Sequence, residues 1–244
     1  MLITREEAKA KGIANVVKEH DVQFFDFGCS NGGSIESVRT YFFNGSKGMG
    51  FDISAAKLET AKQNHLVSDF DILDLPEEPL VNFTILFHIL EHLDTQRAVE
   101  RFLQKACAVS KDFVFLKQPF FDADPSLMAH GLKLYWSDWS GHPNRMTSLE
   151  LYLILARLLE EKKIEGFQIV GKKRIQNSSC PQVLPLVAPR NQHDYDPDQH
   201  PPKRTDVVFD FPVFYELGAL IEIKKETGTD FLKNFKPDAV IHST

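Results

Sequence analysis

The sequence has few cysteines and no apolar run long enough to cross a membrane. Its three cysteines, Cys29, Cys107 and Cys180, are not spaced as metal ligands or as a redox pair, so we expect free thiols in a reducing compartment. The longest apolar runs, residues 83–90 and 149–159, are shorter or more interrupted than the ~20-residue segment that spans a bilayer. The N-terminal residues lack the apolar core of a signal peptide. We therefore expect a cytoplasmic protein with no membrane partner.

Basic residues are also scarce relative to acidic ones. The chain has 28 Lys and Arg against 34 Asp and Glu, which gives a net charge of −6. Binding to nucleic acid depends mainly on basic side chains that neutralise phosphates, so no nucleic-acid partner is expected. A length of 244 residues, 43% of them hydrophobic, is typical of one globular domain over residues 1–244. The oligomeric state stays open.

Short apolar segments alternate with amphipathic segments of helical period. This alternation predicts βαβ units and an α/β fold, a mainly parallel sheet covered by helices. The predicted strands are residues 22–28, 48–54, 66–73, 83–90, 112–117, 167–175 and 218–224, and the predicted helices are 4–20, 34–42, 55–64, 96–109 and 148–162.

Two long segments, residues 122–146 and 180–206, interrupt this alternation. Long connections inside a domain are usually functional loops or disordered. The first contains Tyr135, Trp136 and Trp139 and is expected to be ordered, whereas the proline-rich second is left open. Because both follow parallel strands, we interpret them as active-site loops or insertions that shape a pocket.

The sequence DFGCSNGGS, residues 26–34, predicts a strand, a tight glycine turn and the start of a helix. Gly28, Gly32 and Gly33 let the backbone approach a ligand closely. Asp52 follows 20 residues after Gly32, at the end of the next predicted strand, where a carboxylate can accept both hydroxyls of a ribose.

Two other patterns match the same glycines. In the dinucleotide fingerprint G-x-G-x-x-G, Ser30 stands at the position of the middle glycine. The carboxylate of Asp26 would not help to bind a pyrophosphate, whereas it would help to bind a ligand with a cationic amino group. Residues 28–32 also spell the nucleophile elbow G-x-S-x-G. An elbow normally follows several strands, and this one follows the first, so Ser30 as a nucleophile is the minor interpretation.

Four motifs in order, DFGCSNGG, GFDIS, DILDLP and FHILEHL, resemble those of the class I S-adenosylmethionine-dependent methyltransferases. The similarity covers roughly residues 20–175 and is strongest to the small-molecule group with an EHL motif after the fourth strand. It implies a doubly wound, Rossmann-like sheet of seven strands with the last antiparallel. It also implies S-adenosylmethionine as cofactor and methyl transfer to oxygen, or less readily to nitrogen or carbon, of a small metabolite.

The resemblance implies that the first motif holds the methionine end of the cofactor, that the second takes the ribose and one adenine face, and that the third contacts the adenine edge. Phe87 and His88 would lie beside the sulfonium. Asp69 is a near rival of Asp71, which has an equal chance of being a solvated turn residue. The implied cofactor-binding residues are Asp26, Gly28, Ser30, Gly32, Asp52, Ile53, Asp71, Ile72, Phe87 and His88.

The pattern departs from the family at two positions. Ser30 replaces a common glycine, and Asn82 stands where many relatives have an aspartate. Neither change removes a group that methyl transfer requires. They leave, as an alternative, a non-catalytic protein that binds the cofactor or serves in assembly. An RNA or protein methyltransferase is a further alternative with less support, because the chain is acidic.

Three histidines are candidate general bases: His88, His92 and His142, in no order of preference. Residues 88–92 spell H-x-x-E-H, but zinc ligation by that motif needs both histidines on one helix, and here His88 ends a strand, so no metalloprotease centre is expected. A structural metal is left open and no metal ligands are assigned. His92 could equally bond a buried backbone group, and His142 could be a surface loop residue.

Overall fold

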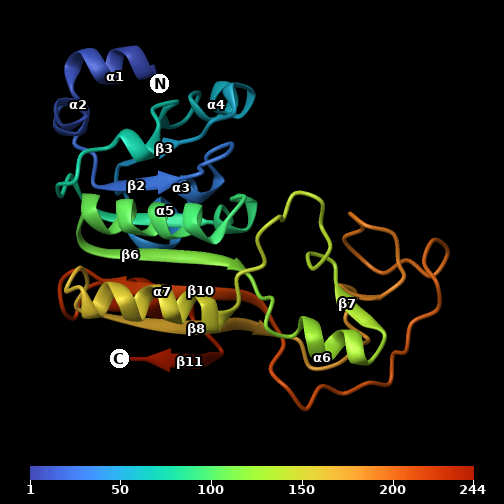
Figure 1. The fold of residues 1–244 in the computed structure, drawn as a ribbon. Helices are drawn as coiled ribbons and strands as arrows, with labels where there is room; N and C mark the ends of the chain where they lie inside the picture. The colour runs from blue at the N-terminus through green and yellow to red at the C-terminus, as the bar shows by residue number, and fades with distance from the viewer.

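One sheet of nine strands runs through the computed structural model, which describes residues 1–244 (Figure 1). The strands from β1 to β6 pair in parallel, whereas β10 is antiparallel to both of its neighbours. Across the sheet the order is β1 (Leu2–Ile3), β4 (Leu66–Ser68), β3 (Gly48–Phe51), β2 (Phe24–Phe27), β5 (Val81–Phe87), β6 (Ser110–Pro119), β10 (Phe214–Glu222), β8 (Gly166–Arg174) and β11 (Ala239–Ser243).

This order confirms the predicted fold, an α/β, doubly wound, mainly parallel sheet with a late antiparallel strand. The sheet has two strands more than the predicted seven, because β1 and β11 extend its two edges. A two-residue strand such as β1 has no period to detect, and β11 pairs with β8 through a register shift near Val240.

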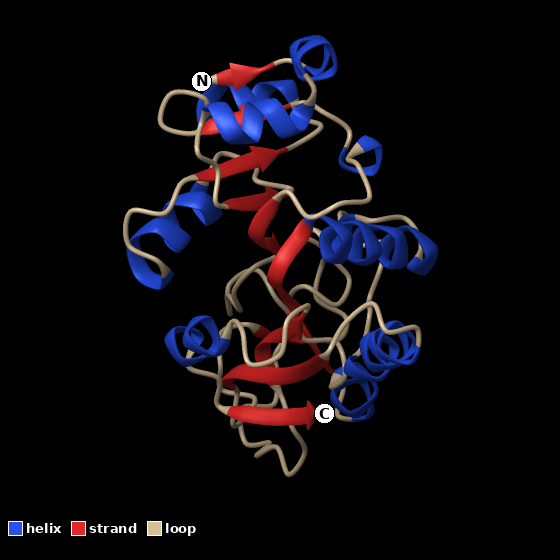
Figure 2. Ribbon diagram, turned by 90° about the vertical axis from the view of Figure 1, so that its left-hand side faces the viewer, coloured by secondary structure: helices blue, strands red, loops and turns tan.

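Helices cover both faces of the sheet (Figure 2). One core cluster holds residues of α1, α2, α5 and α7, and a second holds residues of α3, η1, α4 and α8. The helices are α1 (Arg5–Lys11), α2 (Ile13–Glu19), α3 (Gly33–Ser37), the π-helical η1 (Val38–Phe42), α4 (Ala55–Ala61), the 3₁₀ turns η2 (Ile72–Asp74) and η3 (Leu90–His92), α5 (Gln96–Val109), α6 (Asp124–Ala129), α7 (Ser148–Glu160) and α8 (Thr229–Phe235).

Strand β2 is a nearly continuous apolar run because both of its faces are buried. Successive side chains of a strand point to opposite faces, and Phe24 belongs to one core cluster while Phe25 and Phe27 belong to the other. Asp26 shares the face of Phe24, on which α3 packs. A carboxylate is therefore buried under the helix that follows the glycine turn.

Two predicted elements differ most from the observed ones. The helix expected over residues 4–20 begins with the predicted capping box of Thr4 and Glu7, but Gly12, at φ +78°, divides it into α1 and α2. The strand expected over residues 66–73 ends at Ser68. The Asp71 side chain accepts a hydrogen bond from the Leu73 N–H at 2.9 Å, which turns the chain into η2 instead.

The two long segments pack against each other beyond the carboxyl end of β6 (Figure 1). Strands β7 (Leu132–Leu134) and β9 (Val183–Pro185) form a separate antiparallel pair. The buried Lys133 ammonium joins the two segments, since it contacts Asp138 at 2.6 Å and donates to the Ala188 carbonyl at 2.5 Å. No helix of the structure has the length and apolar character that crossing a membrane would require.

Candidate active site

A cavity of about 580 Å³ opens at the carboxyl ends of the parallel strands β2, β3, β5 and β6. The chain leaves β2 toward β3 on one side and returns to β5 on the other, so this is the switch point where doubly wound sheets bind ligands. Its lining includes Gly28, Ser30, Asp52, Phe87, His88, His92 and Lys117. The predicted glycine loop, ribose carboxylate and two of the three candidate histidines are thus brought to one cavity.

The glycine loop has the left-handed backbone conformations that its glycines allow. Gly28 and Gly32 have φ of +79° and +87°, and a Cβ on Gly28 would lie 2.7 Å from the Cδ1 of Ile89. Ser30 also adopts a left-handed conformation, with φ +49°. The Ser30 N–H donates to Oδ2 of Asp52 at 2.8 Å, which joins the loop to the end of β3.

Asp52 stands at the position predicted for a ribose contact. Its Oδ1 accepts from the Ser54 N–H at 2.8 Å, so each oxygen holds one backbone donor and keeps a second acceptor site. The neighbouring Ile53 side chain is fully exposed. An apolar side chain left in solvent beside a cavity can pack on a flat ring, the role that the resemblance implies for it.

Asp26 lies beneath the cavity and does not line it. Ser34 lines the cavity and donates its hydroxyl to Oδ2 of Asp26, while Oδ1 is buried without any partner. Burial raises the pKa of Asp26 to about 7, with the Ser34 hydrogen bond opposing the shift and the negative charge of Asp52 adding to it. A cationic group bound near Ser34 would favour the charged carboxylate.

The third motif lies outside this cavity. The side chain of Asp71 caps η2, and Ile72 belongs to the hydrophobic core. Its rival Asp69 accepts from the Arg5 N–H at 2.7 Å. The adenine contacts of Asp71 and Ile72 therefore stay predictions, and the turn role considered for Asp71 is present in the structure.

His88 is bonded at both ring nitrogens. Nδ1 lies 3.2 Å from Oε1 of Glu91, and Nε2 lies 3.3 Å from Oε1 of Glu216, which also pairs with Lys117 at 3.0 Å. Burial by itself lowers the pKa of His88, but the hydrogen bonds to Glu216 and Glu91 outweigh it and raise the pKa to about 9. Burial by itself raises the pKa of Glu216, but the contacts of Glu216 with His88 and Lys117 outweigh burial and lower the pKa to about 2.

Sequence reasoning missed both carboxylates of this network. Glu216 lies 128 residues from His88 and reaches it only because β10 inserts next to β6. Its one sequence signal is an acidic residue within the apolar strand YELGALI, which alone does not identify a partner.

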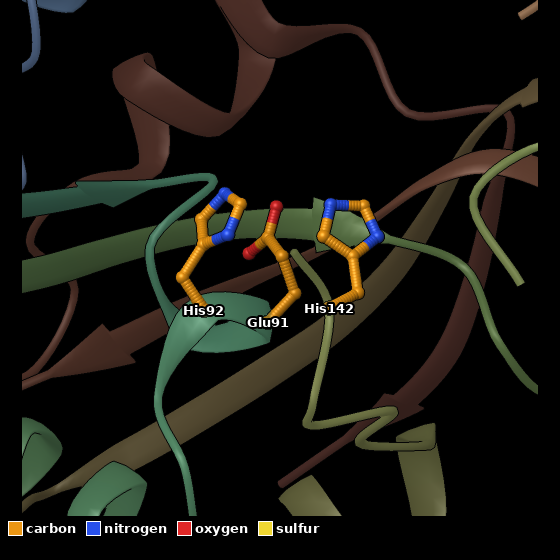
Figure 3. Close-up of side chains that lie close together, drawn as sticks. All are labelled: Glu91, His92 and His142. Atoms are coloured by element: carbon orange, nitrogen blue, oxygen red, sulfur yellow. The ribbon is translucent and has the colours of Figure 1, made fainter. Parts of the chain in front are cut away.

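The third candidate histidine comes from the first long segment. His142 lies beside His92, with ring centroids 5.1 Å apart, and Glu91 lies between them in Figure 3. Each Nδ1 contacts a backbone carbonyl, His92 that of Gly141 at 2.6 Å and His142 that of Trp136 at 3.1 Å. Burial lowers the pKa of His142, although the Trp136 hydrogen bond and the charge of Glu91 act in the opposite direction.

Fold and site together define a doubly wound α/β protein with a ligand cavity at its switch point. No family model and no curated protein matches the chain. Among solved structures, a SAM-dependent methyltransferase from Archaeoglobus fulgidus is similar, with 15% identity, a TM-score of 0.56, and 89% of this chain and 94% of that chain covered. The chain therefore has the fold of the class I S-adenosylmethionine-dependent methyltransferases.

Two further solved structures are more distant. A methyltransferase from Methanosarcina mazei is 12% identical, with a TM-score of 0.45 and coverage of 86% of this chain and 96% of that one. The plantazolicin methyltransferase BpumL, solved with SAH, is 14% identical, with a TM-score of 0.47 and coverage of 82% and 76%. Both TM-scores lie below 0.5, which marks a more distant similarity.

Proposed function

We propose that this protein is an S-adenosylmethionine-dependent methyltransferase that transfers a methyl group to an oxygen of a small metabolite. The observation that carries the proposal is the junction of the glycine loop with Asp52 at the switch point of a methyltransferase-type sheet. The bound cofactor supplies an electrophilic methyl group on a sulfonium. The protein then needs mainly to position the acceptor and to exclude water.

The residues present fit this cofactor. The partnerless Oδ1 of Asp26 suits a cationic amino group nearby, and Gly28 lines the cavity without a side chain, so a ligand can approach the backbone there. Asp52 keeps acceptor sites for ribose hydroxyls, and exposed Ile53 offers an apolar surface for the adenine. Phe87 and His88 line the cavity at the end of β5, on the side predicted for the sulfonium.

The histidines and the two long segments form the side of the pocket that would bind the methyl acceptor. His88 has both nitrogens engaged by carboxylates, so in this geometry it donates and has no lone pair to take a proton. His92 and His142 each keep one nitrogen without a protein partner, available to an acceptor. Contacts from the second long segment support the loop of His142, since Asn191 Oδ1 accepts from the Ser140 N–H at 2.8 Å. We expect residues 122–146 and 180–206 to shape this side of the pocket.

The test is calorimetric titration of the protein with S-adenosylmethionine, S-adenosylhomocysteine and NAD. Micromolar binding of the two adenosyl ligands to the wild type, lost in Asp52→Ala, is the expected result. Asp230→Ala is the matched control, because Asp230 is an exposed aspartate on α8 that pairs only with Lys233. Melting curves establish that both variants are folded. Binding of NAD alone, or of none of the three ligands, would refute the proposal.

A further inference from the structure

Glu91, His92 and His142 bring one potential metal-ligating atom each to a common point. These atoms lie within 4.8 Å of one another, and Figure 3 shows the Glu91 carboxylate between the two imidazole rings. Glu91 is only 2% exposed, and its Oε2 is buried without a hydrogen-bond partner. Burying a carboxylate oxygen without a partner is unfavourable, and a bound cation would compensate it.

The surroundings hold these side chains as metal ligands are usually held. Histidines that bind a metal normally donate their other N–H to a carbonyl or carboxylate, which fixes the ring and its tautomer. Here the Nδ1 atoms of His92 and His142 contact the carbonyls of Gly141 and Trp136, which leaves the Nε2 lone pairs free. The second oxygen of Glu91 is fixed by His88.

The backbone also ties the two contributing segments together. Glu91 and His92 are adjacent in the 3₁₀ turn η3, and the ligand atoms that they offer lie within 4.8 Å of each other. The Asn144 N–H donates to the Glu91 carbonyl at 3.3 Å, and the Asn144 side chain donates to the Leu90 carbonyl at 3.4 Å. The loop that carries His142 is therefore anchored to η3 through groups other than the three ligands.

We propose that Glu91, His92 and His142 bind one divalent first-row transition-metal ion, such as Zn²⁺ or Co²⁺. Two imidazoles and one carboxylate suit these ions, whereas Mg²⁺ and Ca²⁺ take oxygen ligands. Three protein ligands leave at least one coordination position open, as in catalytic rather than structural sites.

The position of the site gives the ion a role that rests on the proposed function. His92 also lines the cavity proposed for the cofactor, so an ion held by this residue would lie beside that cavity. An acceptor hydroxyl bound there has a lowered pKa and loses its proton to solvent water, which leaves a stronger oxygen nucleophile. The two imidazoles then act as ligands and not as bases. The acceptor class is a hydroxyl compound able to coordinate a metal.

The test uses the full chain, stripped of metal by a chelator and titrated with ZnCl₂, with CoCl₂ as a spectroscopic probe. We expect one Zn²⁺ per chain and a visible Co²⁺ spectrum. Glu91→Gln and His142→Ala should each lower the Zn²⁺ affinity by roughly 10–100-fold or more, because loss of a group that only supports a ligand already has an effect of that size. His130→Ala is the control, because His130 is exposed on the same long segment and should bind as the wild type does.

Titration of the same metal-free protein with S-adenosylmethionine separates the two proposals. Cofactor binding without Zn²⁺ binding overturns the metal site and leaves the methyltransferase proposal intact. Zn²⁺ binding without cofactor binding overturns the methyltransferase proposal and leaves the metal site intact. Zn²⁺ binding that survives in both ligand variants also overturns this site, and melting curves of the two variants exclude unfolding as the cause of any loss.

Discussion

Replacing Asp26 with asparagine should stabilise the free protein at alkaline pH and weaken its binding of S-adenosylmethionine. Asp26 is fully buried, and its pKa rises from an ordinary value of 3.8 to about 7. The folded state therefore holds this proton more tightly than the unfolded state does. The stability that protonation contributes is fully present below the unfolded pKa and is lost as the pH rises through about 7.

The magnitude follows from the two pKa values. One pKa unit corresponds to about 1.4 kcal/mol, so ionisation of Asp26 removes about 2 kcal/mol from the free energy of unfolding between about pH 5.5 and about pH 8.5. Asparagine has no proton to lose and keeps an oxygen that can accept from Ser34. The stability advantage of Asp26→Asn over the wild type should therefore grow by about 2 kcal/mol across this range.

Urea denaturation of the two proteins at both pH values measures the effect, because groups that titrate equally in both cancel in the difference. Calorimetry at the higher pH should show cofactor affinity reduced about tenfold in the variant, since a negative charge near the cofactor's ammonium group is lost. Asp230→Asn, an exposed aspartate on α8, should change neither quantity. A stability difference that is the same at both pH values would refute this account of Asp26.

Two glycine-loop substitutions test the backbone strain. Ser30→Gly should raise the free energy of unfolding by about 0.5–1 kcal/mol, because the left-handed strain it removes exceeds the entropy that glycine adds to the unfolded chain. Ser30→Ala keeps the Cβ and should show no such gain; an equal gain would contradict the explanation. Gly28→Ala should cost at least about 2 kcal/mol and abolish cofactor binding, since its Cβ meets Ile89 at 2.7 Å with φ at +79°. Gly33→Ala has no atom within 4 Å of its Cβ and should be mild, so equal losses in thermal melts would argue against the steric cause.

The three candidate histidines differ in their surroundings. Sequence reasoning treated His88, His92 and His142 as equivalent candidates for a general base. The structure gives them different partners, because His88 lies between two carboxylates while the other two rings converge on Glu91. Glu91 contacts His88 and lies beside the other two rings, so one buried carboxylate organises all three histidines.

Features that depend on neighbours along the chain could be predicted from the sequence. An apolar run ending in glycines indicated β2 and its loop, and the spacing to Asp52 indicated the end of β3, because strand and helix periods and turn chemistry are local. The alternation of segments indicated the doubly wound class through the same local patterns.

Contacts between distant residues could not be predicted in this way. The contact of Glu216 with His88 depends on where β10 enters the sheet, and that of His142 with Glu91 depends on how a long loop folds back onto η3. The antiparallel pairing of β7 with β9 joins the two long segments, and their compositions do not predict this pairing. Such contacts are selected by the packing of the whole core, so no spacing within one segment encodes them.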